Sequence, residues 1–151
     1  MFGIIDTSGM FKVKPRYEQL IYLGGLYGYK NGAHWSTFSM ILDTINSGVY
    51  ESLDALGMGM VLFKQEGKYG VMNDDFKVLL TPSQRSIKRF KDYFVVIPCE
   101  DDLSYLYDIN GKLISPVGYE KIQPVNEEHL LLSLKNKISY FRLSDGKLIH
   151  F

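Results

Sequence analysis

The chain has 151 residues, of which 46% are hydrophobic and 14% aromatic, enough for one domain or one repeat array with a core of ordinary size. Lysine plus arginine and aspartate plus glutamate each number 17, and this zero net charge excludes nonspecific nucleic-acid binding, which depends on a basic surface. No run of 18 or more residues is continuously apolar, which excludes a membrane-spanning helix.

The sequence does not open with a charged and then apolar leader, so we expect cytoplasmic localisation. Cys99 is the one cysteine, and it therefore has no partner for an internal disulfide. Because cysteine is among the residue types most often buried, we expect Cys99 to be buried or half-buried.

A turn recurs every 35 residues along the chain. Hydrophobic stretches end in turns at Gly32, Gly67, Asp102 and Lys137, which are each 35 residues apart. A fixed period of this size predicts stacked copies of one supersecondary unit. We therefore expect a single β-repeat domain over 1–151, with units at about 1–32, 33–67, 68–102 and 103–137 and a partial unit at 138–151.

The elements within the units are short β-strands joined by tight turns. Residues 2–6 and 10–15 flank a turn at 7–9, and 69–73 with 77–82 and 105–108 with 112–116 repeat this arrangement. At these turns the Asx residues Asp6, Asn73 and Asp108 stand three positions before Gly9, Phe76 and Gly111. An Asx side chain in this position accepts hydrogen bonds from backbone N–H groups, so tight turns are predicted there.

Other strands are marked by apolar residues that repeat with the same period. Residues 17–23 correspond to 50–56, 84–90 and 119–125, and further strands are expected at 26–30, 60–64, 94–97 and 130–134. Proline cannot donate to a ladder, so Pro15, Pro82 and Pro116 are predicted to end their strands. The second unit opens atypically, with residues 36–42 leading to a turn at 46–48.

The predicted fold class is therefore all-β. Tandem β-hairpin repeats of about 35 residues would stack into a compact superhelical or barrel-like array. The alternative is a small propeller-like ring, although 35 residues is short beside the roughly 40–45 of a four-stranded blade.

The residues resemble those of the WG-repeat family of bacteria. Two segments are similar to the opening of such a unit, namely Phe2-Gly3-Ile4-Ile5-Asp6-Thr7-Ser8-Gly9 and Lys68-Tyr69-Gly70-Val71-Met72. A third segment is similar to its later part, namely Pro15-Arg16-Tyr17-Glu18-Gln19-Leu20. At the positions equivalent to the aromatic–glycine pair, the other copies have a different pair of residues, namely His34-Trp35, Ser104-Tyr105 and Ser139-Tyr140. The resemblance implies a β-repeat protein that binds other proteins, with an immunity or adaptor protein that binds an effector as its specific form.

Two charged clusters are candidate partner-binding residues. Arg85, Lys88, Arg89 and Lys91 form the basic cluster, and Glu100, Asp101 and Asp102 form the acidic one. They are either solvated turns or a dipolar surface that recognises a protein partner. Similarly, Tyr29, His34 and Trp35 are either aromatic anchors of an interface or ordinary core residues.

A further row of charges shares one phase of the repeat. The same position of the repeat is occupied by Glu18, Glu51 and Glu120 in three units and by Arg85 in the third unit along the chain. If the units stack in register, this row is a charge ladder between them, and otherwise it is an acidic row for a cation or a basic partner.

Catalysis has little support in the sequence. His34, His129 and His150 are far apart and lack metal-ligand spacing, and no nucleophile elbow, P-loop or dinucleotide-binding motif is present. The negative charges of Glu100 and Asp101 next to Cys99 disfavour a thiolate nucleophile there. We therefore expect no enzyme, no cofactor and no metal site.

The predicted function is a non-enzymatic protein-binding module. The alternatives are a carbohydrate or small-ligand binder that uses aromatic side chains such as Trp35, and a structural segment of a longer surface protein. Exposed strand edges also allow an edge-strand dimer.

Overall fold

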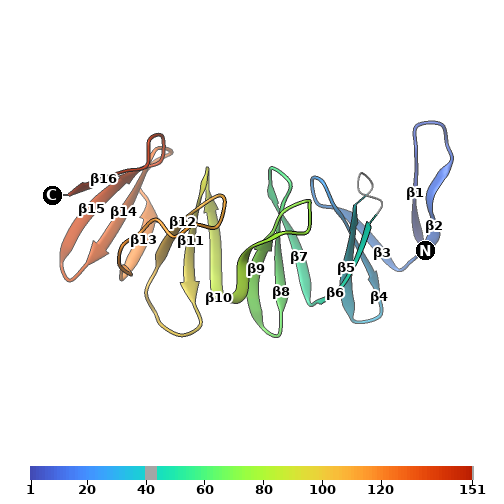
Figure 1. The fold of residues 1–151 in the computed structure, drawn as a ribbon, viewed down its shortest axis with the longest axis horizontal. Coiled ribbons are helices and arrows are strands. Elements are labelled where there is room, and N and C mark those ends of the chain that lie inside the picture. Colours follow the sequence, from blue (N-terminus) through green and yellow to red (C-terminus); the bar gives the residue numbers. More distant parts are fainter. Residues whose placement is uncertain (40–43, 151) are drawn as a thin grey trace. The chain divides into compact units, whose positions relative to one another are not determined.

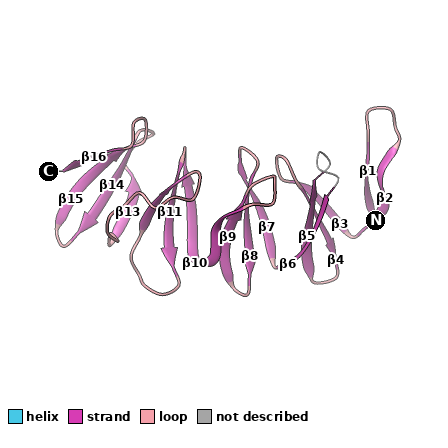
Figure 2. Cartoon of the chain, in the orientation of Figure 1, coloured by secondary structure: helices cyan, strands magenta, loops and turns pink. Residues whose placement is uncertain are grey.

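A computed structural model describes residues 1–39 and 44–150 and confirms the all-β class. Figure 2 shows strands joined by turns, with no helix among the described residues. The chain, predicted as one domain, divides into two compact units, Met1–Pro82 and Ser83–Phe151. In the part of the chain that the structure describes, no helix is long and apolar enough to cross a membrane.

The first unit contains one hairpin and two antiparallel meanders (Figure 1). The hairpin pairs β1 (Phe2–Ile5) with β2 (Phe11–Tyr17). The next sheet has the order β3 (Gln19–Tyr22), β4 (Tyr27–Asn31), β5 (His34–Ser39), β6 (Thr44–Tyr50). The third has the order β7 (Ser52–Gly57), β8 (Met60–Gln65), β9 (Lys68–Met72), followed by β10 (Val78–Phe90), which belongs to this unit up to Pro82.

The second unit begins within β10 and contains two further meanders. From Ser83 onward β10 pairs with β11 (Tyr93–Pro98), which pairs with β12 (Tyr105–Asp108). An isolated bridge then joins Tyr107 to Leu113. The last sheet has the order β13 (Lys121–Pro124), β14 (His129–Leu134), β15 (Lys137–Arg142), β16 (Lys147–His150).

The repeat is visible as four strands that begin at equivalent positions. β4, β8, β11 and β14 begin at Tyr27, Met60, Tyr93 and His129, which are 33, 33 and 36 residues apart. Of the residues that mark the period in sequence, Gly32, Gly67 and Asp102 lie between the second and third strands of a meander, and Lys137 begins the third strand of the last one, so the expected unit boundaries fall inside the sheets. The choice between an open array and a ring concerns the arrangement of the two units and stays a prediction.

The predicted Asx turns are confirmed in both units. Asp6 accepts hydrogen bonds from the N–H groups of Ser8 and Met10 at 2.9 and 3.0 Å. The side chains of Asn73 and Asp108 each accept two backbone N–H bonds in the same way. The residue three positions later has positive φ in all three turns, including 63° at the non-glycine Phe76.

Each unit has its own hydrophobic core. One cluster includes Leu26, Val61, Phe63 and Met72 of the first unit, and the other includes Leu106, Leu130, Leu132 and Phe141 of the second. One buried position recurs just before the first strand of each meander, where Tyr17, Tyr50 and Tyr119 are at most 6% exposed. Gln84 takes the same position in the third copy and is also buried.

Three local expectations are wrong or fall outside the description. Cys99 is exposed, because it follows the end of β11, where its backbone N–H donates to Ser83 at 3.2 Å while its side chain faces solvent. Pro15 and Pro82 lie inside β2 and β10, and β10 continues because it pairs with β9 before Pro82 and with β11 after it. The atypical opening of the second unit expected at 36–42 lies partly in residues 40–43, outside the described residues, and the turn expected after it at 46–48 lies inside β6.

Candidate protein-binding surfaces

A groove of about 550 Å³ in the second unit is the leading candidate site. One wall comes from the end of β10 and the turn after it, and the other from the β13–β14 turn and the residue after β15. The residues that line it are Arg89, Phe90, Lys91, Pro124, Asn126, Glu127 and Leu143. Hydrophobic side chains thus form the groove together with cationic and anionic ones.

The β10–β11 hairpin holds the basic wall in place. Arg89 is opposite Phe94 and Phe90 is opposite Tyr93 at the closing end of the ladder. Lys91 has a φ of 50°, in the left-handed region, and its carbonyl oxygen accepts a hydrogen bond from Arg89 Nε at 2.7 Å. The guanidinium is therefore fixed to the turn and is not a freely moving side chain.

The opposite wall is fixed by backbone contacts of the β13–β14 turn. Asn126 Oδ1 accepts the N–H groups of Glu128 and His129, each at 2.9 Å. The N–H of Leu143 donates to the carbonyl of Glu128 at 2.7 Å, and its side chain is buried. Hydrogen bonds therefore hold both walls of the groove, which is lined by apolar and charged residues, an arrangement that can hold an extended segment of polypeptide.

The structure brings together the two charged clusters through one ion pair. Arg85 Nη1 lies 2.7 Å from Asp102 Oδ1, with half of the Arg85 side chain exposed. Asp101 accepts bonds from the Leu103 N–H at 2.8 Å and from the Tyr105 hydroxyl at 3.0 Å. The hydrogen bond to Asp101 raises the pKa of the Tyr105 phenol. These contacts satisfy Arg85, Asp101 and Asp102 locally and leave Arg89 in the groove and Glu100 exposed.

The charged side chains that share one position of the repeat contact turns of their own sheets at Glu18, Glu51 and Arg85. Glu18 accepts the Gly32 N–H at 3.2 Å, and Glu51 accepts the Gly67 N–H at 2.9 Å. At the third copy the Arg85–Asp102 pair spans the same two positions. Glu18, Glu51 and Arg85 therefore contact turns of their own sheets, and the charge ladder between units and the acidic row for a cation or a basic partner stay predictions.

The aromatic candidates of the first unit belong mainly to its packing. Tyr29 is half-buried, with its ring centroid 4.4 Å from that of Tyr17 and 6.0 Å from that of Phe38. Trp35 packs against the core cluster, and Lys30 Nζ lies 5.9 Å from its ring centroid. Only His34 is exposed, at the start of β5.

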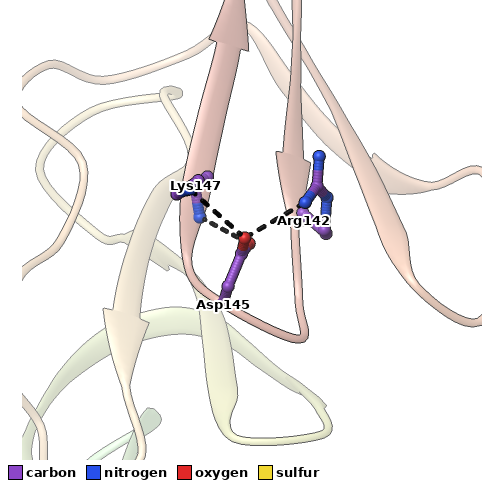
Figure 3. A network of polar contacts seen from close by, with 3 residues as sticks. All are labelled: Arg142, Asp145 and Lys147. Carbon is purple, nitrogen blue, oxygen red and sulfur yellow. Dashed lines mark hydrogen bonds and ion pairs between the residues drawn. The ribbon is translucent and has the colours of Figure 1, made fainter.

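Two cations near the β15–β16 turn pair with one carboxylate. Figure 3 shows Asp145 between them in this turn, with Arg142 Nη1 at 3.1 Å and Lys147 Nζ at 4.0 Å from Asp145 Oδ2. Within residues 1–39 and 44–150, no group of three His, Cys, Asp or Glu side chains could hold a metal ion.

The sequence did not single out the apolar residues of the groove. Phe90 and Val125 share a repeated apolar position, and both stand at the end of a first strand, where a side chain reaches the rim of the sheet. A signal for Phe90 was therefore present in the repeat. Pro124, Asn126 and Leu143 become neighbours of Arg89 only through folding.

Comparison with known proteins gives a likeness of fold only. No family model and no curated protein matches the chain. Hsv2 from Kluyveromyces lactis is similar at 10% identity and a TM-score of 0.45, over 84% of this chain and 46% of that one. PorZ from Porphyromonas gingivalis gives 14% identity and a TM-score of 0.41, over 99% of this chain and 24% of that one.

The N-terminal domain of Nup159 is similar at 9% identity and a TM-score of 0.42, over 95% of this chain and 50% of that one. The chain thus spans half the length of these three proteins or less. Membership of the WG-repeat family stays a prediction.

Proposed function

We propose that the chain is a non-enzymatic protein-binding module whose groove in the second unit takes a segment of a partner protein. The observation that carries this proposal is that Arg89, held by its bond to the Lys91 carbonyl, lines the groove together with Lys91, Phe90 and Leu143. Cations beside apolar surface suit a segment that combines carboxylates with hydrophobic side chains. Within this class, the resemblance to bacterial WG repeats favours an immunity or adaptor protein that binds an effector.

The aromatic residues support a protein partner over a carbohydrate. Sugar binding through Trp35 would require a free ring face, whereas this ring packs against the core and has Lys30 beside it. The groove instead offers charges of both signs, with Glu127 opposite Arg89 and Lys91. Such a pattern fixes the register of a peptide and discriminates between partners.

The test is capture of a partner by the purified chain, compared with a charge-reversed groove. We expect one stoichiometric protein to be retained, and the Arg89→Glu/Lys91→Glu variant to bind it at least about tenfold more weakly. The matched control is Lys112→Glu/Lys121→Glu, which reverses two exposed charges of the same unit outside the groove.

Unchanged capture by the groove variant would contradict the site, provided that circular dichroism shows both variants folded. Binding of a glycan on an array, lost on Trp35→Ala and retained in the groove variant, would support the carbohydrate alternative instead.

A further inference from the structure

The groove of the second unit has a counterpart within the first unit. In both units, the turn after the third strand of one meander approaches the turn after the first strand of the meander before it. A Cβ added at Gly25 of the β3–β4 turn would lie 2.8 Å from Asp74 Cβ of the β9–β10 turn. A Cβ added at Gly146 of the β15–β16 turn would lie 2.9 Å from the hydroxyl oxygen of Tyr93, at the start of β11. Equivalent elements therefore build both places.

In the first unit a carboxylate of the chain itself lies in this place. Asp74 Oδ2 is 2.7 Å from the position of a Cβ at Gly59 and 3.0 Å from that of a Cβ at Gly25, so the carboxylate lies against the backbone of two turns. These turns consist of Gly24-Gly25 and Met58-Gly59 and have no charged side chain. The occupant is thus an acidic residue on a β-turn, and Asp74 remains exposed on its other side.

In the second unit the equivalent turn keeps its carboxylate elsewhere. Asp145 of the β15–β16 turn pairs with Arg142 and Lys147, as Figure 3 shows, and is not among the residues that line the groove. The residue of this turn that does line the groove is Leu143. This turn therefore adds an apolar side chain where the β9–β10 turn adds a carboxylate.

The wall that faces this place differs in the opposite sense. Lys91 begins the two-residue β10–β11 turn as Gly24 begins the β3–β4 turn, and their φ angles are 50° and 90°. Lys91 is exposed, and none of the ion pairs between described residues includes it. Arg89 lines the groove beside it. Cations therefore line the place in the unit where the chain supplies no Asp74, and glycine lines it where Asp74 is present.

We propose that the partner segment that this groove binds is an acidic β-turn, with one carboxylate against Lys91 and Arg89 and its backbone against Leu143. The inference rests on the proposed function, because it names the chemistry of the segment for the same groove. Hydrogen bonds between ionised groups are about twice as strong as neutral ones, so the two cations select a carboxylate. Glu127 on the opposite wall repels a second carboxylate and so orients the turn.

A turn is a better occupant than an extended acidic segment. The turn that presents Asp74 is closed by two backbone N–H bonds to the Asn73 side chain, at 3.0 and 2.9 Å. A flexible segment loses conformational entropy when it binds, whereas a closed turn has lost most of it beforehand.

The test uses a fluorescent cyclic peptide with the sequence of residues 72–78, titrated with the whole purified chain and followed by anisotropy. We expect saturable binding that Lys91→Gly weakens at least about tenfold, because a charged hydrogen bond is lost. Lys135→Gly is the matched control, since Lys135 is also exposed, has a φ of 48° in another turn of the second unit and does not line the groove. Glycine is favoured at both φ angles, so both variants are expected to fold.

Peptide variants test the carboxylate and the turn separately. Asp74→Asn in the peptide is expected to weaken binding about tenfold, whereas Asp75→Asn is expected to retain it. The open-chain peptide is expected to bind more weakly than the cyclic one.

Three outcomes would overturn the proposal. The first is no saturable binding at about 1 mM cyclic peptide, which would also be seen if another part of the chain covered the groove. The second is an equal loss of binding in Lys91→Gly and Lys135→Gly. The third is equal binding of the cyclic peptide and its Asp74→Asn or open-chain form.

This inference and the proposed function fail separately. Suppose that the chain captures a partner protein, that Arg89→Glu/Lys91→Glu loses it, and that the cyclic peptide does not bind. The groove would then be supported as the partner site, and the acidic turn would be rejected as its occupant. Displacement of the captured partner by the cyclic peptide would support both.

Discussion

Strands β9 and β1 have the same local pattern and very different surroundings. Both are aromatic–glycine–aliphatic strands that end in an Asx turn. β9 lies between two strands and buries Val71 and Met72 fully, whereas β1 has one neighbour and leaves Phe2 and Ile5 more than half exposed. The repeated residues therefore determine the local strand and turn conformation through contacts within about ten residues. The neighbouring strands determine how far the side chains are buried.

The same difference predicts uneven stability within the first unit. An isolated two-stranded hairpin is at best marginally stable in water, and segments with few buried contacts open at lower free energy than a core sheet. The β1–β2 hairpin is expected to exchange its amide protons faster than β8 and β9.

The largest expected difference comes from truncating one aromatic residue in each region. Phe63 is 3% exposed, so Phe63→Ala is expected to lower the free energy of unfolding by about 3–5 kcal/mol. Phe2→Ala removes a mostly exposed ring and is expected to cost less than about 1 kcal/mol. Urea unfolding followed by the fluorescence of Trp35, the one tryptophan, reports on the first unit. Equal losses for the two variants would show that the hairpin belongs to the core.

Two glycines of the β9 region sharpen the comparison further. A Cβ at Gly70 would lie 2.8 Å from the backbone carbonyl oxygen of Leu80, so Gly70→Ala is expected to cost about 2 kcal/mol through overpacking. Gly67 has no atom near its Cβ position but has a φ of 75°, so Gly67→Ala is expected to cost about 1 kcal/mol. The same urea experiment measures both variants, and a larger loss at Gly67 would contradict the close approach of β10.

Much of the local structure could be predicted from the sequence because it depends on near neighbours. The Asx turns at Asp6, Asn73 and Asp108 follow from side chains that bond their own backbone. The strands before each period-marking turn follow from the repeated apolar residues. These features need no knowledge of which strands lie alongside.

What could not be predicted depends on contacts distant in sequence. Arg85 was expected beside the glutamates of other units, but it bonds Asp102 across a hairpin of its own unit. The groove joins Arg89 of β10 to Leu143, which follows β15 of another sheet. The exposure of Cys99 depends on how the chain leaves β11, and residue preference carried no information about it.

A smaller loss of stability is expected when the hydrogen bond from the Gly67 N–H to Glu51 is removed. Glu51 accepts the Gly67 N–H at 2.9 Å, which holds the β8–β9 turn against the start of β7. Glu51→Ala is expected to destabilise the first unit by about 0.5–1 kcal/mol, the typical net value of a hydrogen bond in a partly exposed site. Glu51→Gln keeps an acceptor and is expected to retain most of that stability by the same measurement. A loss in Glu51→Gln as large as in Glu51→Ala would mean that charge, and not the turn contact, is responsible.

The last difference between the two regions is their response to acid. The side-chain hydrogen bond from Ser8, supported by backbone N–H groups, lowers the pKa of Asp6, whereas Asn73 accepts the equivalent backbone bonds through a neutral amide, with Asp74 and Asp75 beside it in the turn. Since the folded pKa of Asp6 is depressed, its stabilisation is complete above the ordinary aspartate range and is lost as pH falls through the folded pKa. When the amide hydrogen bonds are followed by NMR in an acid titration, those of Ser8 and Met10 are expected to loosen and those of Asp75 and Lys77 to Asn73 are expected to be retained. Asp6→Asn is expected to abolish this pH dependence while it keeps the turn, because the asparagine side chain still offers an acceptor. If acid loosened the Asp6 and Asn73 turns equally, protonation of Asp6 would not be the cause of the loosening.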